Sequence, residues 1–109
     1  MKEIYRWHAE ICTTFSNPIR LEILDLLRGG ELSVSDLVKK TGLTQANISQ
    51  HLSIMKNKGI VNPSRKGKNI FYALSNPKIV RAFDIIREIL RERLKGNKKL
   101  AGRWRGDLA

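Results

Sequence analysis

Residues 33–59, SVSDLVKKTGLTQANISQHLSIMKNKG, decide the fold of this chain. Ser33 is suited to cap a short helix, because Asp36 follows three residues later in an approximate capping box. Gly42 marks a tight break after that helix, and Thr44 is suited to cap the next one. A short helix, a turn of three or four residues that contains Gly, and a second helix form the helix-turn-helix pattern.

The second helix of this pattern, expected from residue 45 to about residue 58, has two different faces. At 100° per residue, Ile48, Leu52 and Met55 share the face that turns toward the core. The opposite side carries small and amide side chains and no acid. Asn and Gln can bond adenine bidentately in the major groove, and Ala can meet a thymine methyl. We therefore expect DNA contacts from this helix and its cap, at Thr44, Gln45, Ala46, Asn47, Ser49, Gln50 and Ser53. His51 lies at the edge of the core face, where both a packing role and a phosphate contact are open.

The residues after Gly59 change from a helical period to a period of two, which indicates strands. A first strand starts at Ile60, and Pro63 places it at a sheet edge or breaks it. Residues 70–74 form the return strand, with residues 65–69 as the hairpin tip. Cations crowd this tip, which suits a hairpin that lies against phosphates or reaches into a minor groove. We expect these contacts from Arg65, Lys66, Lys68 and Asn69.

Helices are expected on both sides of this segment. Residues 3–15 form an amphipathic helix. Asn17 is suited to cap a second helix with Pro18 in its first position, and that helix is apolar around most of its girth, so we expect it to be buried. The last helix, residues 77–95, has an apolar stripe that one small domain can hardly cover. Its positions Ile79, Phe83, Ile86 and Leu90 are expected to serve one core, with Ile85 and Ile89 to one side. We interpret the excess as a dimer seam, formed by Ile4, Trp7, Ile11, Ile85, Ile89 and Leu90, and additional intramolecular core is the alternative.

The composition limits the class of protein. The chain has 109 residues, the length of one domain at roughly 100 to 200 residues per domain. Its formal net charge is +11, and residues 37–83 contain no acid, so a polyanion is the expected partner. No apolar run approaches the about 18 residues that span a bilayer, the start of the chain is too charged for a secretory signal, and one Cys forms no internal disulfide. We expect a cytoplasmic protein without a membrane segment, with one domain over residues 1–95 and a basic, flexible tail over residues 96–109.

The order helix, helix, helix-turn-helix, basic hairpin and final helix is that of a winged helix-turn-helix protein, mainly α with a small β-hairpin. The chain resembles the ArsR/SmtB (arsenic-repressor) family of transcriptional regulators over about 60 residues. The matching pieces agree in order and spacing: SNPIRLEIL (16–24), ELSVSDL (31–37), ISQHL (48–52), GIV (59–61), RKGK (65–68) and FYAL (71–74). The resemblance implies a homodimer built mainly on the first and last helices. It also implies a two-fold symmetric DNA operator, repression of transcription, and release when a ligand or stress is sensed.

The chain departs from the metal sensors of this family. Their paired cysteines correspond to Ser33 and Ser35, and hydroxyls are poor ligands for thiophilic ions. Matched through the preceding strand, the second metal site of the family corresponds to Asn76, Lys78, Ile89 and Glu92, of which Glu92 alone is a ligand type. The resemblance therefore implies a regulator without the usual metal sites, and its effector is not evident from the residues.

His8 and Cys12 are four residues apart and so share a helix face. The interpretation that we favour is a structural cysteine beside an incidental histidine. Two alternatives stay open: in a dimer, two such pairs offer four ligands for a tetrahedral metal site, and two Cys12 thiols can cross-link as a redox switch.

The sequence has features of one other class of function besides a DNA-binding regulator. A non-regulatory module that binds RNA or shapes DNA is one alternative, because Trp104 in the basic tail can stack on an unpaired base. An enzyme is not expected, since the sequence has no Ser-His-Asp arrangement, no phosphate-cradling Gly loop and no paired carboxylates. No cofactor is expected either.

Overall fold

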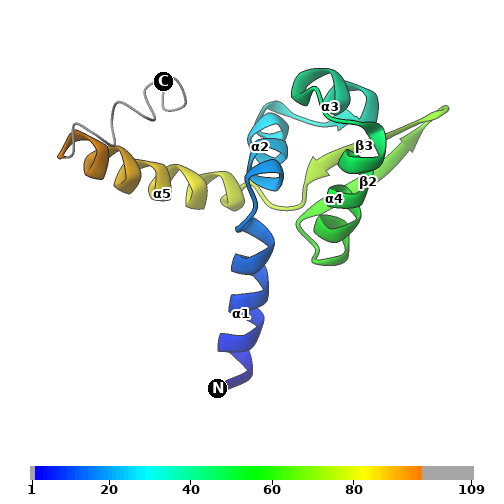
Figure 1. Cartoon of the computed structure of the whole chain (residues 1–109). Coiled ribbons are helices and arrows are strands. Elements are labelled where there is room, and N and C mark those ends of the chain that lie inside the picture. Colours follow the sequence, from blue (N-terminus) through cyan, green and yellow to red (C-terminus); the bar gives the residue numbers. More distant parts are fainter. Residues whose placement is uncertain (1, 97–109) are drawn as a thin grey trace. The chain divides into compact units, whose positions relative to one another are not determined.

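The computed structural model of the chain describes residues 2–96, so the predicted tail lies, apart from Gly96, outside the described residues. The described part is mainly helical and carries one small sheet, as the sequence predicts (Figure 1). In chain order its elements are α1 (Lys2–Phe15), α2 (Pro18–Leu26), the 3-10 turn η1 (Leu27–Gly29), β1 (Leu32–Ser33), α3 (Val34–Thr41), α4 (Gln45–Asn57), β2 (Val61–Lys66), β3 (Asn69–Leu74) and α5 (Lys78–Lys95). The chain divides into two compact units between Pro77 and Lys78.

Three helices of the first unit begin at the caps that the sequence predicts. The Asn17 side chain accepts hydrogen bonds from two backbone N–H groups of the first turn of α2. Ser33 and Asp36 form a reciprocal capping box at the start of α3, with both bonds at 3.0 Å. Thr44 Oγ1 accepts from the Asn47 N–H at 3.2 Å at the start of α4. These bonds satisfy N–H groups that have no partner within their own helix, which fixes where each helix starts.

The hydrophobic core of the first unit lies between α2, α3, α4 and the start of β2. It includes Ile48, Leu52 and Met55, whose predicted core positions are confirmed because all three are fully buried. The expectation that α2 is buried is correct for only part of the helix. Within α2, Ile23 and Leu24 are fully buried, whereas Leu21 is 37% exposed. The helix packs against α1, α3 and α4, and these contacts leave Leu21 partly exposed.

The wing is a three-stranded antiparallel sheet in the order β1-β3-β2, whereas the sequence predicts a hairpin of two strands. Strand β2 lies at the edge, which confirms the alternative in which Pro63 occupies an edge strand, where a missing N–H is tolerated. Strand β1 is not predicted, because two residues are too few to show a period. It is defined by its pairing with β3, in which Leu32 lies opposite Tyr72 and Ser33 opposite Phe71.

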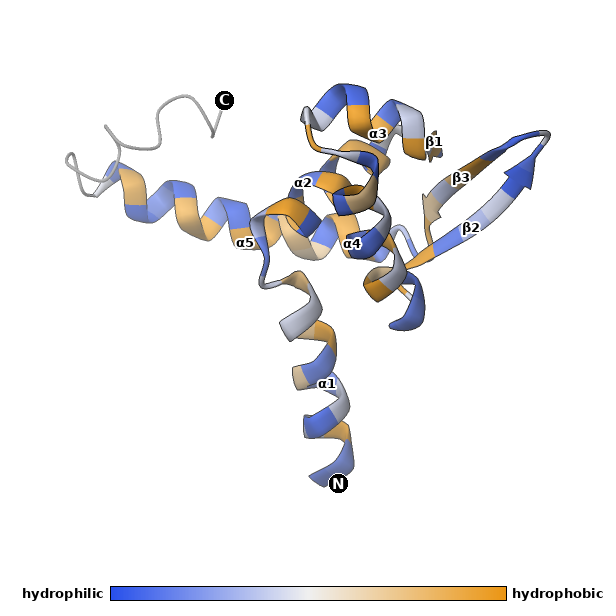
Figure 2. Cartoon of the chain, turned by 45° about the vertical axis from the view of Figure 1, so that its right-hand side comes forward, coloured by the Kyte–Doolittle hydropathy of each residue, from blue (hydrophilic) through white to orange (hydrophobic). Residues whose placement is uncertain are grey.

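The hairpin turn is shorter than the predicted tip over residues 65–69. Strand β2 continues to Lys66 and β3 resumes at Asn69, so the turn consists of Gly67 and Lys68. Gly67 has a φ of 63°, which glycine adopts without steric cost. In Figure 2 the distal end of the hairpin is hydrophilic and its base is more hydrophobic. Most of the predicted tip cations therefore lie on regular strands rather than in a loop.

The second unit contains α5. Phe83 and Leu94 are its buried residues, and Ile79 and Leu90 are half-buried. Ile86 was expected in the core, but its side chain is 62% exposed, as exposed as its neighbours Ile85 and Ile89. At 100° per residue, Ile86 stands about 60° from Phe83 and about 60° from Ile89, so periodicity alone does not assign it to either face. None of the helices in residues 2–96 has the length and apolar character that a membrane span requires.

Candidate nucleic-acid interface

Helix α4 presents the polar face that the sequence predicts. The turn before it contains Gly42, whose φ of 73° and N–H bond to the Val38 carbonyl at 2.9 Å end α3. The side chains proposed to contact DNA are exposed, except that Asn47 is half-buried; the exposed ones are Thr44, Gln45, Ala46, Ser49, Gln50 and Ser53. Because no acid lies among them, this face can approach a phosphate-lined groove without charge repulsion.

His51 lies at the edge of the core face of α4 and connects this helix to α2. Arg20 Nε donates to His51 Nδ1 at 3.3 Å, and Arg20 Nη1 donates to the Thr14 carbonyl at 3.2 Å. Burial, followed by the nearby Arg20 guanidinium, lowers the pKa of His51 from 6.5 and so favours its neutral form. Of the two roles that the sequence leaves open for His51, the structure shows the packing role. Arg20 ties the end of α1 and the middle of α4 to α2, and sequence reasoning missed it.

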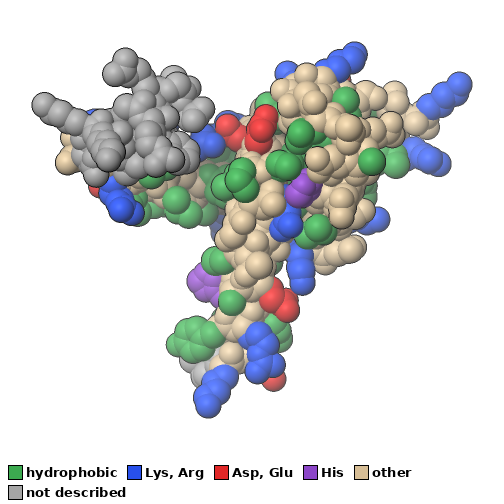
Figure 3. Space-filling model, in the orientation of Figure 1, with side chains coloured by type: hydrophobic (Ala, Val, Ile, Leu, Met, Phe, Trp, Pro, Cys, Tyr) green, Lys and Arg blue, Asp and Glu red, His purple; other side chains and the backbone are tan. Residues whose placement is uncertain are grey.

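The wing carries the second group of predicted contacts. Arg65, Lys66, Lys68 and Asn69 are all exposed, and Figure 3 shows lysine and arginine side chains projecting from the far end of the hairpin. Lys66 is not free, however. Its Nζ forms an ion pair with Glu31 and lies 5.3 Å from the centre of the Phe71 ring.

Glu31 places a negative charge beside the hairpin, whose own residues include no acid. Its second oxygen accepts a hydrogen bond from Ser64 Oγ at 3.5 Å, so it contacts two residues of β2. In the sequence, Glu31 directly precedes the two residues that pair with β3. Its contact with β2 can be inferred only after this pairing is known.

The candidate metal and redox residues are separate from this interface. His8 and Cys12 are both exposed on α1. Within residues 2–96, no group of three or more His, Cys, Asp or Glu side chains is arranged to hold a metal ion. Ser33, which stands at one of the metal-site cysteine positions of the resembled family, is buried and caps α3 through its hydroxyl.

The residues predicted to form the dimer interface lie on two helices, α1 in the first unit and α5 in the second. On α1, Ile4, Trp7 and Ile11 are exposed, and so is Tyr5, which sequence reasoning missed. On α5, Ile85 and Ile89 are exposed and Leu90 is half-buried. Exposed apolar side chains at helical spacing are typical of an interface that is covered in an assembly.

The fold and this site define a class of protein. A capped helix-turn-helix whose second helix exposes an acid-free polar face, followed by a basic β-wing, is a winged helix-turn-helix DNA-binding module. The profile described as "Bacterial regulatory protein, arsR family" matches residues 17–63, from the cap of α2 into β2. The chain belongs to the ArsR family of DNA-binding transcriptional regulators, which are not enzymes.

Individual relatives cover most of the described chain. The transcriptional repressor SdpR of Bacillus subtilis is 38% identical over 60 residues, which are 55% of this chain and 67% of SdpR. The transcriptional activator HlyU of Vibrio cholerae is 32% identical over 74 residues, 68% of each chain. A solution structure of the homodimeric winged helix-turn-helix DNA-binding domain of Mb0332 from Mycobacterium bovis superimposes with a TM-score of 0.78 at 28% identity, covering 85% of this chain and 86% of that one.

Proposed function

We propose that this protein is a sequence-specific regulator that binds double-stranded DNA as a homodimer on a two-fold symmetric operator and represses transcription. The observation that carries the proposal is the exposed, acid-free face of α4 on the same unit as the basic wing. The amide side chains of α4 read base edges, and Arg65, Lys66 and Lys68 contact phosphates or the minor groove. The proposed place of action is the cytoplasm.

The exposed apolar side chains of α1 and of α5 support a homodimer, as does the homodimeric state of the Mb0332 domain. A two-fold dimer presents two copies of α4, so its operator has two half-sites about one helical turn apart. We propose repression because the relative SdpR is a repressor. The relative HlyU is an activator, so the experiment also has to determine the direction of regulation.

The proposed regulator does not use the usual metal sites of its family. Ser33 and Ser35 offer hydroxyls at one site. At the other, Lys78 brings a positive charge and Glu92 is the single ligand type. Hydroxyls and a cation do not form a site for a thiophilic or divalent ion.

Selection of bound duplexes from a random DNA library, at a salt concentration of about 150 mM, tests this proposal. We expect a two-fold symmetric consensus, with a dimer bound when light scattering is measured on the complex. If each protomer neutralises about four phosphates, the affinity falls with salt at a log–log slope near −7. A reporter gene placed behind the selected site then shows repression or activation.

Equal affinity for scrambled duplexes, or for single-stranded RNA, contradicts the proposal. Charge alone would then drive association, and the protein would be an architectural or RNA-binding module. If binding increases transcription, the protein is still a sequence-specific regulator, but it is an activator and not a repressor.

A further inference from the structure

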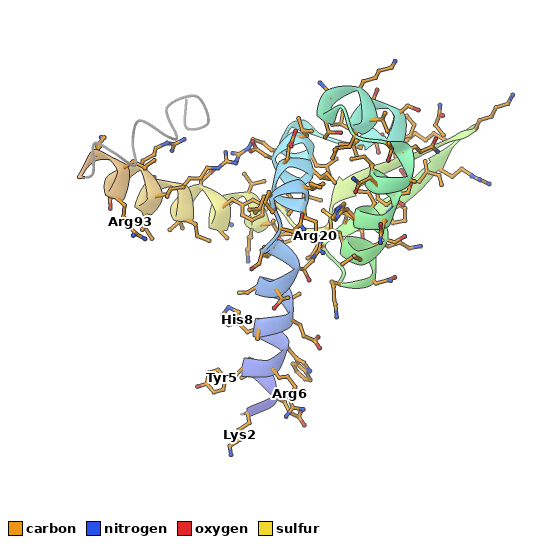
Figure 4. All side chains as sticks on the ribbon, in the orientation of Figure 1. Lys2, Tyr5, Arg6, His8, Arg20 and Arg93 are labelled. Carbon is orange, nitrogen blue, oxygen red and sulfur yellow. The ribbon has the colours of Figure 1, made fainter. Side chains whose placement is uncertain are left out.

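A pocket of about 350 Å³ lies in the first unit between α1, α2 and α4. Its walls bring together residues from the middle of α1, the start of α2 and the end of α4, and the DNA-binding role proposed above uses none of them. Figure 4 shows Arg6 on the side of α1 that faces α4, with Tyr5 and His8 pointing to the other side, and Arg20 where α1, α2 and α4 meet. The pocket therefore connects the helix proposed for dimerisation with the helix proposed to read DNA.

The inner surface of the pocket is apolar. Ala9 and Ile54 contribute hydrocarbon directly. Thr13 and Thr14 also line it, but their hydroxyls bond to carbonyls one turn earlier in α1, at 2.8 and 2.9 Å. Since these hydroxyls are already bonded, a ligand meets mainly apolar groups and excludes water from them, which favours binding of a hydrocarbon chain.

The charged groups around this surface are mostly positive. Arg6, Arg20 and Lys58 line the pocket together with a single acid, Glu10. Glu10 Oε2 lies 3.7 Å from Lys58 Nζ, and both side chains are exposed, so this ion pair is weak. Arg6 makes no hydrogen bond or ion pair within residues 2–96. A guanidinium matches a carboxylate bidentately, so the charges favour an organic anion.

Part of the α1 wall of this pocket lies away from the face of α1 that is proposed to form the dimer. Arg6, Ala9 and Thr13 recur at spacings of three and four along α1, as do Ile4, Trp7 and Ile11, but the two sets lie on opposite sides of the helix at 100° per residue. The apolar set is available to a second copy, while the pocket set faces α4.

We propose that this pocket binds a small organic carboxylate with an apolar tail, and that its occupancy weakens DNA binding. The regulatory half of this inference rests on the proposed function. Arg20 carries the coupling, because its guanidinium already holds His51 of α4 and the Thr14 carbonyl at the end of α1. A carboxylate in the pocket competes for that guanidinium and loosens α4 from α2. By linkage, operator DNA lowers the affinity for the carboxylate by the same factor.

Isothermal titration calorimetry on the full chain tests the binding, with sodium hexanoate as the probe and hexylammonium chloride as the probe of opposite charge, at constant ionic strength. We expect saturable hexanoate binding and no hexylammonium binding. Arg6→Gln and Lys58→Met weaken hexanoate binding about tenfold, the loss expected for one charge-assisted hydrogen bond. Lys56→Met is the matched control, because Lys56 is exposed near the end of the same helix and does not line the pocket. Absence of saturable hexanoate binding, or equal weakening by Lys56→Met, overturns the site.

DNA titrations separate this proposal from the proposed function. In the absence of probe, Arg6→Gln and Lys58→Met should bind the selected operator with the affinity and salt slope of the unaltered protein. A smaller slope in these variants would mean that the pocket cations contact DNA phosphates, which overturns the pocket as an effector site. Saturating hexanoate that leaves operator affinity unchanged overturns the coupling. Hexanoate binding by a protein that prefers no DNA sequence contradicts the proposed function and leaves the carboxylate site established.

Discussion

The bond between Arg20 and His51 depends on a single proton. A guanidinium stays charged and always donates, so His51 Nδ1 accepts only while the imidazole is neutral at that nitrogen. Burial and the neighbouring Arg20 charge both lower the pKa of His51, so the folded protein favours the neutral form. His51 therefore contributes stability that is complete above the unfolded pKa.

We predict that the free energy of unfolding decreases as the pH falls below about 6.5, the unfolded pKa of histidine. The unfolded chain binds the proton more readily than the folded chain, so stability is lost between that value and the lowered pKa of His51. Urea titrations from pH 7.5 to pH 5 measure the change. In His51→Gln the side-chain oxygen can still accept from Arg20 and does not titrate, so the decrease should shrink. An unchanged decrease in that variant would assign it to other groups.

Gln50 and Lys68 are exposed residues with different proposed roles, one on α4 and one in the wing turn. We predict that Gln50→Ala relaxes the preference for one base pair by about 1–3 kcal/mol. Lys68→Ala should weaken all sequences alike and make the salt slope of the dimer shallower by about 2, one phosphate contact for each protomer. Competition binding with operators altered at single positions measures both effects. If Gln50→Ala kept every preference, the assignment of α4 as the reading helix would be wrong.

At the scale of elements, the wing combines three strands with a charge pair that the hairpin alone does not contain. Strand β1 pairs with β3 and is preceded directly by Glu31, while Lys66 ends β2. The resulting surface ion pair engages Lys66, one of the three wing cations. A phosphate that contacts Lys66 has to compete with this carboxylate, so Glu31 reduces the contribution of charge alone to binding.

We predict that Glu31→Gln increases affinity for all DNA sequences and makes the salt slope of the dimer steeper by about 2, because Lys66 of each protomer becomes available to a phosphate. Glu22→Gln on α2 removes the same charge from an exposed site and serves as the control. Fluorescence anisotropy at several salt concentrations measures the slopes. Equal slopes in the two variants would show that net charge, and not the release of Lys66, sets the affinity.

At the scale of the whole molecule, each of the two units exposes apolar side chains at helical spacing. In the first unit they lie on α1, and in the second on α5. Burial of such side chains contributes roughly 25 cal/mol per Å² of apolar surface, so a second copy that covers them stabilises both units. In the proposed complex, dimerisation also places two copies of α4 on one DNA duplex, which a single chain does not achieve.

We predict that Ile89→Glu shifts the protein toward the monomer, because a carboxylate would be buried in the seam without a partner. Operator affinity should fall, and the magnitude of the salt slope should drop to about half, since one protomer contacts about half of the phosphates. Analytical ultracentrifugation and operator titrations measure the two effects. Glu88→Gln, at an exposed neighbouring position, is the control. A dimer that persists in Ile89→Glu would exclude this residue from the seam.

The sequence by itself determined the features that rest on near neighbours in the chain. The caps at Asn17, Ser33 and Thr44 join atoms at most three residues apart, so the residue types alone predict where α2, α3 and α4 begin. The same holds for the core face of α4, which follows from helical spacing. The proposed DNA contacts are also predicted from residue types alone. They remain predictions, because the chemistry of a side chain indicates the kind of partner but not where that partner binds.

Only the tertiary structure decided the features that join distant segments. Arg20 and His51 are 31 residues apart, and Glu31 and Lys66 are 35 apart. The strand β1, the ion pair of the wing and the pocket between α1, α2 and α4 all depend on such contacts. No local period encodes them, because each exists only after burial of the shared apolar core has brought the segments together.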